Sequence, residues 1–461
     1  MYYLAVDIGA SSGRHILGKF ENGKVELKEI YRFENGAEKK GESLIWDIEK
    51  LFSNVVAGIK ECKKLGVIPY SVGIDTWGVD YALLDENNKV IGDVYSYRDN
   101  RNQGMTEKSE ECVSFKELYS RTGIQHAVFN TVYQLYHDKL TGKLSKAKKF
   151  LTVPDYLHYR LSGVMVNEYT DASTTALINA KTRTWDFDII KKYGFPTEIF
   201  QKVVEPGTVL GRFTEEIKNE VGFDAYVVIP ATHDTASAVM AVPAKTSNPL
   251  YISSGTWSLL GTELSEPITN ESAYNFNMTN EGGFAHTIRF LKNISGMWTI
   301  QSIKKELQSK YNYEELMLMA IEVGDFGSVV NINDDRFLAP KSMINEVKNC
   351  CKDNGLKVPE TIGEVMNVVY RSLATLYAKT IKSLEQITGV TYSALNIVGG
   401  GSKDRYLNEL AKEYTKKSVF VGPTEGTAVG NLLAQAISSK EVKDISEGRQ
   451  IVINSFGIKE I

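Results

Sequence analysis

The chain lacks any apolar run long enough to cross a membrane. A transmembrane helix needs roughly 20 consecutive apolar residues, and no stretch of these 461 residues approaches that length. No basic segment opens the sequence, and Asp7 interrupts its first apolar residues before the core of a secretory signal could form. We therefore expect no membrane partner and no export, and the predicted location is the cytoplasm.

Cysteine and surplus charge are also scarce. The four cysteines form no C-x-x-C pair, and adjacent cysteines such as Cys350 and Cys351 rarely bond to each other or share one metal ion. We predict that all four are reduced thiols. The 53 Lys and Arg residues stand against 57 Asp and Glu residues, a net charge of −4, so no global positive field exists to hold a nucleic acid. A small-molecule partner is favoured, and the sequence leaves monomer and homodimer open.

Two common nucleotide-binding signatures are missing. The nearest approach to a P-loop has Glu42 where the motif needs lysine. The triple glycine Gly399–Gly401 follows an apolar run, but Asp404 stands where a dinucleotide fingerprint needs its last glycine. This turn could lie against a flat ring or a sugar, or it could simply connect a strand to a helix. A nicotinamide-dependent dehydrogenase is therefore one alternative function.

What is present predicts two α/β domains, because 461 residues exceed one ordinary core. Near the N-terminus we expect a strand at residues 2–8, a glycine turn at 9–13 and a second strand at 15–20. The pair Asn22-Gly23 is a strong hairpin signal and leads to a third strand at 25–33. These segments predict an antiparallel meander at the start of the first domain.

The pattern of strand, glycine turn and strand recurs at residues 250–264, which indicates a diverged duplication. The intervening segment 242–249 is rich in Pro, Ser and Asn and predicts a boundary with a hinge near residue 245. The predicted domains are therefore residues 1–244 and 245–461.

Helical and strand patterns follow each meander. Apolar residues recur at helical spacing in 47–65 and 361–388, and short apolar runs at 71–75 and 394–399 predict strands. Helices packed on a mixed sheet are typical of an α/β domain.

The segment Asp7-Ile-Gly-Ala-Ser-Ser-Gly-Arg14 lies in the first glycine turn. Small residues let backbone N–H groups approach an anion, the serines add donors, and Arg14 adds positive charge. Phosphate binding and a simple hairpin turn are both compatible with this motif.

The segment Pro230-Ala-Thr-His-Asp-Thr-Ala236 joins an apolar run to a short helical pattern. A carboxylate at a helix N-terminus is favoured in its ionised form by the helix dipole, so Asp234 could accept a proton at neutral pH. The alternative is that Asp234 only caps the helix.

A third motif, residues 73–80, surrounds Gly78 with carboxylates, a hydroxyl and the indole of Trp77. Sugars are commonly held by such polar groups beside an aromatic face, although a Trp buried at a turn gives the same pattern. Nearby, residues 97–101 could orient a polyol or form a surface ion-pair cluster.

Together these segments resemble the FGGY carbohydrate kinases, a family of the actin, hexokinase and heat-shock chaperone ATPase superfamily. The matching stretches are DIGASSGR (7–14), GIDTWGVD (73–80), YRDNR (97–101), N-T-x-Y-Q-L (130–135), PDYLHYRLSG (154–163), HDTASAV (233–239), SSGTWSLLG (253–261), NEGG (280–283), LKNISGMW (291–298), NDDRF (333–337) and IVGGG (397–401). The resemblance implies two actin-like (ribonuclease H-like) α/β domains with a cleft between them, and ATP and Mg²⁺ as cofactors.

The resemblance also implies roles for individual residues. Asp234 matches the catalytic base, and Asp7 matches the carboxylate that helps to hold Mg²⁺. The implied nucleotide contacts are Ala10, Ser11, Ser12, Gly13, Arg14, Thr256, Asn293, Gln301 and Gly400. The implied sugar contacts are Gly78, His233, Asp234 and Thr235.

Within the family the likeness is closest to the kinases of L-rhamnulose, which implies formation of its 1-phosphate in rhamnose catabolism. Two alternatives remain besides the dehydrogenase. One is a kinase of another ketose, such as L-fuculose or L-xylulose. The other is a sugar-binding and ATP-binding protein of the same fold without transfer activity.

Overall fold

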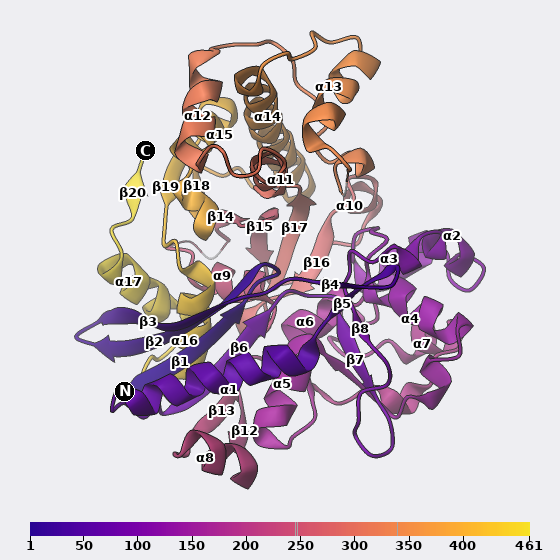
Figure 1. Cartoon of the computed structure of the whole chain (residues 1–461), viewed down its shortest axis with the longest axis vertical. Coiled ribbons are helices and arrows are strands. Elements are labelled where there is room, and N and C mark those ends of the chain that lie inside the picture. Colours follow the sequence, from indigo (N-terminus) through magenta and orange to yellow (C-terminus); the bar gives the residue numbers. More distant parts are fainter. Residues whose placement is uncertain (245, 247, 339) are drawn as a thin grey trace. The chain divides into compact units, whose positions relative to one another are not determined.

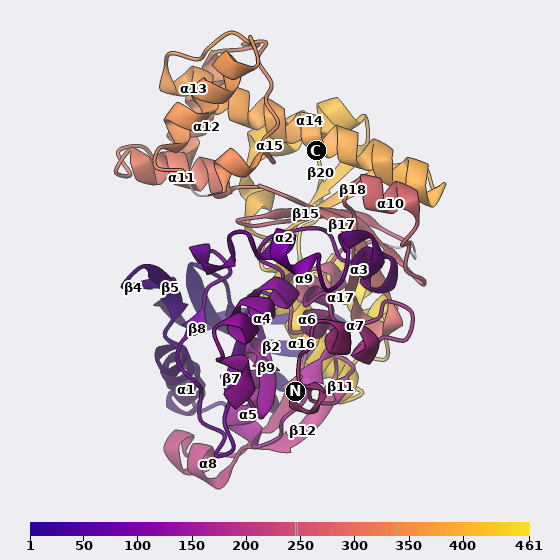
Figure 2. The same ribbon diagram turned by 90° about the vertical axis from the view of Figure 1, so that its right-hand side faces the viewer.

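The computed structural model describes residues 1–244, 246, 248–338 and 340–461 (Figures 1 and 2). The predicted hinge near residue 245 therefore falls on a position outside the described residues. Within the described part of the chain, no helix combines the length and apolar character needed to cross a membrane.

The chain forms two compact units, and neither is one continuous segment of the sequence. The first unit contains Met1–Ala241, Glu263–Phe290 and Gly426–Ser455, and the second contains Val242–Thr262, Leu291–Glu425 and Phe456–Ile461. The predicted domains, residues 1–244 and 245–461, were defined as continuous segments. The units of the structure are discontinuous, so the division after residue 244 stays a prediction.

A sheet with the strand order β12-β13-β6-β1-β2-β3 organises the first unit. These strands are β1 (Tyr2–Ile8), β2 (Ser12–Glu21), β3 (Lys24–Glu34), β6 (Ser71–Thr76), β12 (Thr208–Arg212) and β13 (Tyr226–Ile229). The first three run antiparallel, as predicted, and β6 runs parallel to β1 with Asp75 directly opposite Asp7. Asn22 and Gly23 both have positive φ, 53° and 69°, as a tight two-residue hairpin requires.

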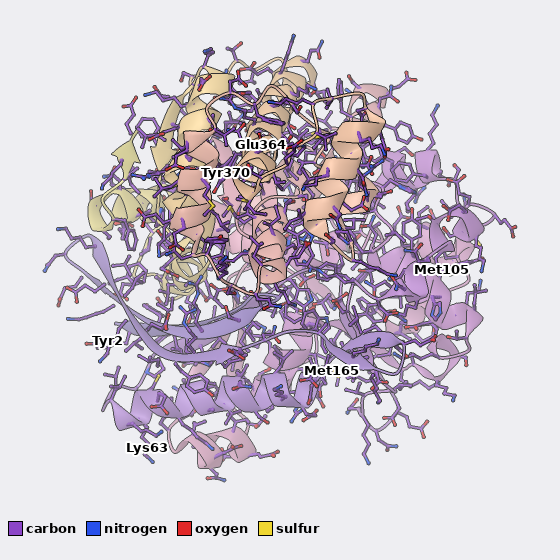
Figure 3. All side chains as sticks on the ribbon, turned by 45° about the horizontal axis from the view of Figure 1, so that its top comes forward. Tyr2, Lys63, Met105, Met165, Glu364 and Tyr370 are labelled. Atoms are coloured by element: carbon purple, nitrogen blue, oxygen red, sulfur yellow. The ribbon has the colours of Figure 1, made fainter. Side chains whose placement is uncertain are left out.

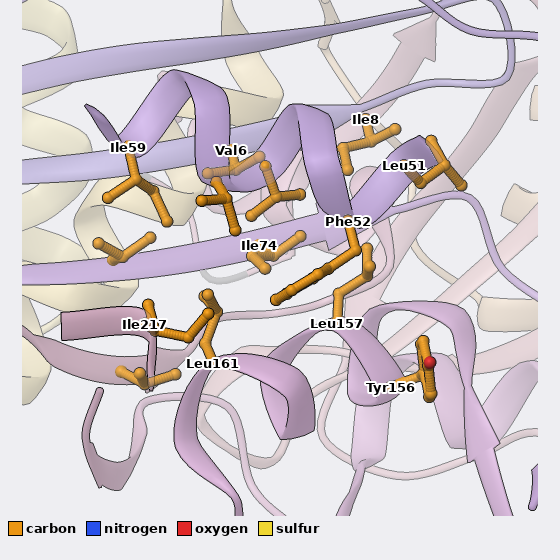
Figure 4. Close-up of a cluster of buried hydrophobic side chains, with 14 of the residues drawn as sticks. Val6, Ile8, Leu51, Phe52, Ile59, Ile74, Tyr156, Leu157, Leu161 and Ile217 are labelled. Atoms are coloured by element: carbon orange, nitrogen blue, oxygen red, sulfur yellow. The ribbon is translucent and has the colours of Figure 1, made fainter. Parts of the chain in front are cut away.

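One face of this sheet is covered by α1 (Ile48–Lys64) and α5 (Val153–Ser162). Figure 4 shows Val6 and Ile74 of the sheet meeting Phe52 of α1 and Leu157 of α5 in a continuous apolar core. The predicted helix at 47–65 is confirmed to within one residue at each end. Alternation along a strand sends every second side chain into this core and the others to the opposite face.

The opposite face carries α16 (Gly426–Ser438), a helix whose residues are almost all buried. Its Gln435 Nε2 donates to the Leu4 carbonyl at 3.0 Å, and its Asn431 Nδ2 donates to the Gly73 carbonyl at 3.1 Å. It also packs on α9 (Asp234–Met240). A Cβ at Gly430 would lie 1.7 Å from the Ser237 carbonyl oxygen, so only glycine allows these two helices to approach this closely.

The first unit contains further strands and helices. The strands are β4 (Glu38–Lys40), β5 (Ser43–Trp46), β7 (Tyr81–Leu84), β8 (Val94–Tyr95), β9 (Lys149–Thr152), β10 (Asn167–Glu168), β11 (Val203–Val204) and β16 (Thr279–Gly282). The α-helices are α2 (Met105–Ser109), α3 (Phe115–Thr122), α4 (Thr131–Leu140), α6 (Tyr169–Thr174), α7 (Phe187–Lys192), α8 (Glu215–Val221), α10 (Glu271–Asn275) and α17 (Ile445–Ser455). Short 3₁₀ turns occupy Asn100–Asn102, Leu144–Lys146, Thr197–Ile199 and Phe284–His286.

The second unit is built on strands in the order β17-β15-β14-β18-β19-β20. Their bounds are β14 (Leu250–Ser254), β15 (Ser258–Leu264), β17 (Ile288–Ile294), β18 (Ala394–Val398), β19 (Ser418–Val421) and β20 (Lys459–Glu460). The pair β14 and β15 is antiparallel, and β18 runs parallel to β14. The strand, glycine turn and strand predicted at 250–264 are thus confirmed.

Helices cover this second sheet. The longest is α14 (Ile362–Thr388), which lies along one face of the sheet in Figure 2 and carries the labelled Glu364 and Tyr370 in Figure 3. The Thr361 side chain and Glu364 form a capping box at its start, so the predicted helix at 361–388 is confirmed. The other elements are α11 (Trp298–Glu306), α12 (Tyr313–Glu322), α13 (Met343–Asp353), α15 (Arg405–Thr415) and the 3₁₀ turns Asp335–Phe337 and Gly400–Lys403.

Candidate active site

The first glycine turn connects β1 to β2 and is held by its own backbone. The Gly9 N–H donates to the Ser12 carbonyl at 2.9 Å, and the Asn35 side chain donates to the Gly9 carbonyl at 2.8 Å. A Cβ at Gly13 would lie 2.1 Å from the Phe33 ring, so packing alone requires glycine at this position. The intermediate to full exposure of Ala10, Ser11 and Ser12 leaves this turn accessible to a ligand.

Arg14 pairs with a carboxylate in the same turn. Its Nη2 and Nε atoms donate to Asp7 Oδ2 at 2.8 and 3.0 Å, and Asp7 is only 6% exposed. The predicted phosphate-binding arginine and the predicted metal-binding aspartate are therefore neighbours. A guanidinium held in this way has a fixed orientation.

A second carboxylate, Asp75, lies opposite Asp7 in the parallel register of β1 and β6. It is fully buried, and its Oδ2 accepts a 2.6 Å hydrogen bond from Asn431, while its Oδ1 has no partner among the described residues. Burial raises the pKa of Asp75 well above its usual range, and the negative charge of Asp7 raises it further. The sequence motif contained Asp75, but the predicted site did not include it.

Asp234 is the first residue of α9, and its side chain retains 32% exposure. The N-cap position falls on His233, and the described structure has no side-chain capping hydrogen bond at this helix. The alternative that Asp234 merely caps the helix is therefore wrong.

The pKa of Asp234 is raised, whereas the sequence predicted that the helix dipole would favour its ionised form. Removal from water raises its pKa, the nearby His233 opposes this rise, and Asp7 adds to it. The expected stabilisation of the ionised form by the helix dipole is outweighed, because the carboxylate is removed from water and the negative charge of Asp7 lies close by. A raised pKa suits a group that must accept a proton near neutral pH.

The predicted sugar-site residues lie together in the first unit. A Cβ at Gly78 would come within 3.1 Å of Thr174 Oγ1 and 3.3 Å of His233 Cδ2. Thr235 follows Asp234 and donates to its Oδ1 at 3.2 Å. These positions are brought together because the Thr76 N–H donates to the Thr232 carbonyl, which joins the end of β6 to the start of α9.

The Nδ1 side of the His233 ring contacts a buried ion pair formed by Arg289 and Glu281. Arg289 Nη2 lies 3.0 Å from His233 Nδ1 and 3.1 Å from Glu281 Oε2. Neither residue was among the predicted site residues, although Glu281 belongs to the NEGG match. No local signal marks Arg289, because its place depends on the pairing of strands that are distant in sequence from α9.

Trp77 does not offer a free aromatic face. It is 6% exposed, and the indole N–H groups of Trp77 and Trp46 both donate to Asp80 Oδ2, at 2.9 and 2.7 Å. Gln134 donates to the other oxygen at 3.1 Å. Burial raises the pKa of Asp80 to about 6, and the Trp46 hydrogen bond opposes this rise. The interpretation of Trp77 as a residue buried at a turn is the correct one.

The polar segment 97–101 contains a buried arginine, Arg101. Arg101 is buried and pairs with Asp138 at 2.6 Å, and its guanidinium lies over the Tyr95 ring. Tyr81 donates to the same aspartate at 2.6 Å. Arg101 is therefore part of a buried network and not of a surface ion-pair cluster.

The second unit contains the other predicted nucleotide contacts, Thr256, Asn293, Gln301 and Gly400. Trp298 N–H donates to the Thr256 carbonyl at 2.9 Å, which brings the start of α11, with Gln301 in its first turn, to the second glycine turn. Asn293 accepts a hydrogen bond from Asn333 at its carbonyl. A Cβ at Gly401 would lie 2.0 Å from Ser254 Oγ, so the triple-glycine turn with Gly400 is adjacent to the end of β14.

A metal site built by the protein alone is not seen in the described residues, where no group of three or more His, Cys, Asp or Glu side chains could hold an ion. Mg²⁺ commonly binds through one or two carboxylates together with substrate phosphates and water. Asp7 and the unpartnered oxygen of Asp75 fit that donor set.

Comparison with known proteins gives matches over both halves of the chain. The model of the N-terminal domain of the FGGY family of carbohydrate kinases matches residues 2–241, and the model of the C-terminal domain matches residues 250–439. A rhamnulokinase of Halalkalibacterium halodurans is 46% identical over 460 residues, which cover 99% of this chain and 98% of that protein. A rhamnulokinase of Bacillus subtilis is 44% identical over 460 residues, covering 100% and 95%.

Solved structures of lower identity share the fold. A ligand-bound xylulose kinase from Lactobacillus acidophilus superposes with a TM-score of 0.81 at 16% identity, covering 100% of this chain and 92% of that one. A glycerol kinase of Plasmodium falciparum with ADP gives a TM-score of 0.78 at 12% identity, covering 99% and 93%. The predicted α/β architecture of two actin-like domains is therefore confirmed.

Proposed function

The chain belongs to the FGGY family of carbohydrate kinases, and on this premise we propose that it transfers the γ-phosphoryl group of ATP to L-rhamnulose. The products are L-rhamnulose 1-phosphate and ADP. The observation that carries this proposal is 46% identity to a rhamnulokinase over nearly the whole of both chains. The role in rhamnose catabolism follows from the substrate.

Asp234 is the proposed general base. Its side chain is partly exposed at the first turn of α9, and its raised pKa gives it affinity for a proton. It would take the proton of the sugar's primary hydroxyl as that oxygen attacks the γ-phosphorus, and ADP leaves. General-base catalysis of this kind contributes about 10²–10⁴-fold to the rate.

The sugar is proposed to lie against Gly78, His233, Asp234 and Thr235. The absence of a side chain at Gly78 lets its backbone lie close to His233 and Thr174. The Thr235 hydroxyl, which donates to Asp234 at 3.2 Å, orients the carboxylate that receives the proton. These groups bind and orient the hydroxyl, which lowers the entropic cost of the reaction.

The nucleotide is proposed to contact two groups of residues. One group is Ala10, Ser11, Ser12, Gly13 and Arg14, and the other is Thr256, Asn293, Gln301 and Gly400. Backbone N–H groups and Arg14 would stabilise negative charge on the transferring group. Asp7, with Asp75 beside it, would hold Mg²⁺, which supplies positive charge that offsets the charge of the phosphates.

We also propose that the reaction takes place in the cytoplasm, where ATP is available and the four free cysteines stay reduced. The partners are then the ketose and ATP, and the protein acts as a monomer or a homodimer.

A coupled assay of ADP release tests the proposed reaction class. Mg-ATP with L-rhamnulose should give ADP at a rate that depends on both substrates. A sugar-binding and ATP-binding protein without transfer activity would give no ADP above background. A dehydrogenase would instead change the absorbance of a nicotinamide cofactor without ATP.

A further inference from the structure

Arg289 is the largest side chain in the described structure that is fully buried. It lies on β17 in the part of that strand that belongs to the first unit. Its Nε donates to the Gly282 carbonyl at 2.7 Å, and its Nη2 lies 3.1 Å from Glu281 Oε2 on β16. A buried charge is costly unless it is paired, and Glu281 supplies the opposite charge for Arg289.

The same Nη2 atom reaches His233 Nδ1 at 3.0 Å. A guanidinium can only donate hydrogen bonds, so Nδ1 must accept with its lone pair. In a neutral imidazole the ring proton then lies on Nε2. The Nε2 atom is the one that faces Asp234, with Oδ1 3.6 Å away.

A competing arrangement would put the ring proton on Nδ1, donating to Glu281. The distance from His233 Nδ1 to Glu281 Oε2 is 3.4 Å, longer than either distance made by Arg289 Nη2. Glu281 is already neutralised by Arg289. Burial raises the pKa of Glu281, but the charge of Arg289 together with the neighbouring His233 more than offsets this and leaves the pKa below its usual value. The distances therefore favour the arrangement in which Nδ1 accepts.

We propose that Arg289, held by Glu281, is a positioning residue that fixes His233 as an acceptor at Nδ1 and a donor at Nε2. The Nε2–H group then points to the side of Asp234 and of the proposed sugar hydroxyl. This inference rests on the proposed function for its consequence in catalysis, but the tautomer itself is a property of the unliganded protein.

The scaffold around Arg289 is suited to this role. Gly282 donates its N–H to Ser173 Oγ at 2.7 Å, and a Cβ at Gly282 would lie 2.6 Å from the Tyr169 ring. The strand that carries Glu281 is thus packed directly on α6. An arginine fixed at its Nε and its Nη2 has little freedom to turn away from His233, which is the requirement for setting a tautomer.

The imidazole ¹⁵N chemical shifts of His233 test the proposal directly in the full chain. The signals are assigned by their loss in His233→Gln. In the wild-type protein we expect Nδ1 without a proton and Nε2 with one. A protonated Nδ1 together with an unprotonated Nε2 would overturn the proposal, whether or not any variant folds or any activity is found.

The double variant Arg289→Met with Glu281→Gln separates positioning from structural support. Neutral replacement of a buried ion pair is often tolerated, so this variant should fold. We expect a mixture of His233 tautomers, and kcat/KM for the sugar lower by at least about tenfold, the effect of a lost hydrogen bond to a charged group, with the KM for ATP unchanged. An unchanged tautomer and unchanged kcat/KM in the folded double variant would contradict the proposal.

A matched control is Arg121→Met with Asp186→Asn. This pair is also in the first unit, with Asp186 buried and bonded to the guanidinium at 2.6 and 2.7 Å, and it touches none of the proposed site residues. We expect the His233 signals and the kinetic constants to stay as in the wild type. Failure of the proposed function would appear as inactive wild-type protein with the predicted tautomer intact, and is thereby distinguished from failure of this inference.

Discussion

His233 Nε2 lies 3.6 Å from Asp234 Oδ1, where the end of β6 meets the start of α9. This distance is too long for a strong hydrogen bond, so the carboxylate of Asp234 is left to receive a proton from another group. The two residues thus share one side of the site without neutralising each other.

The variant Asp234→Asn should lose catalysis while keeping its fold. The N-cap of α9 is His233 and not Asp234, and removal from water already disfavours the ionised form of Asp234, so neutral Asn should cost little stability. We expect kcat to fall by about 10²–10⁴-fold, the contribution of a general base, with a much smaller change in the sugar KM. Steady-state kinetics and thermal unfolding measure the two effects.

A suitable control for that variant is Asp188→Asn, an exposed acidic residue in the first turn of α7. Its kinetics should match the wild type. A folded Asp234→Asn protein that keeps more than about a tenth of the wild-type kcat, far above the level left by a missing base, would remove the catalytic role from Asp234.

Asp75→Asn should stabilise the unliganded protein and weaken its use of Mg²⁺. The side chain is buried beside Asp7 and its pKa is raised, so the fold disfavours its charge. Asn keeps an oxygen to accept the hydrogen bond from Asn431. We expect a higher unfolding midpoint without ligand. We also expect the Mg²⁺ concentration needed for half-maximal activity to rise about tenfold or more, as for other groups that support a metal site. A lower midpoint combined with an unchanged Mg²⁺ dependence would contradict this account of Asp75.

Two buried histidines predict loss of stability in acid. Burial lowers the pKa of both His15 and His158 to about 4, against about 6.5 in an unfolded chain. The folded state therefore favours the neutral ring, so this stability is full above pH about 6.5 and is lost as the pH falls towards 4. Each shift corresponds to about 3 kcal/mol of unfolding free energy.

Urea unfolding at a series of pH values measures this loss. The variant His15→Gln cannot take up the proton and should show a shallower decline between pH 6.5 and 4 than the wild type, a range set by the shifted pKa of His15. Equal slopes in the two proteins would show that His15 does not contribute.

Gly430→Ala should destabilise the first unit although alanine favours helices. The new Cβ would lie 1.7 Å from the Ser237 carbonyl oxygen, so α16 and α9 would have to separate. Overpacking costs about 1–3 kcal/mol, whereas the gain in helix propensity is about 1 kcal/mol. Because α9 begins with Asp234, we also expect lower activity.

Gly36→Ala is the control for this substitution, because nothing lies within 4 Å of the added Cβ and the backbone there is not left-handed. Its unfolding midpoint should equal that of the wild type or exceed it slightly. If Gly430→Ala is as stable as this control, the close approach of the two helices does not constrain the sequence.

Local patterns in the sequence predicted much of the fold. The Asn22-Gly23 turn, the amphipathic α1 and the glycine turn after β14 each follow from residues that are close together in the chain. The same holds for Asp234, which the pattern placed at a helix start.

Contacts between distant residues were not predicted. Asp75 joins Asp7 only through the register of β1 and β6, and Arg289 reaches His233 only through strands of the later sequence. The role of Trp77 was open because its partner Asp80 also binds Trp46, from a different strand. The partners of these three residues can be identified only once the fold is known.

The comparison of kcat/KM for ATP-dependent phosphorylation of L-rhamnulose, L-fuculose, L-xylulose and glycerol tests the proposed function most directly. We predict the highest value for L-rhamnulose and a product phosphorylated at the 1-position. Discrimination by a methyl group amounts to only about 1–3 kcal/mol, so weak activity on the related ketoses is expected. A value for L-fuculose or L-xylulose about tenfold or more above that for L-rhamnulose, which such discrimination could not produce in a rhamnulose kinase, would contradict the assignment.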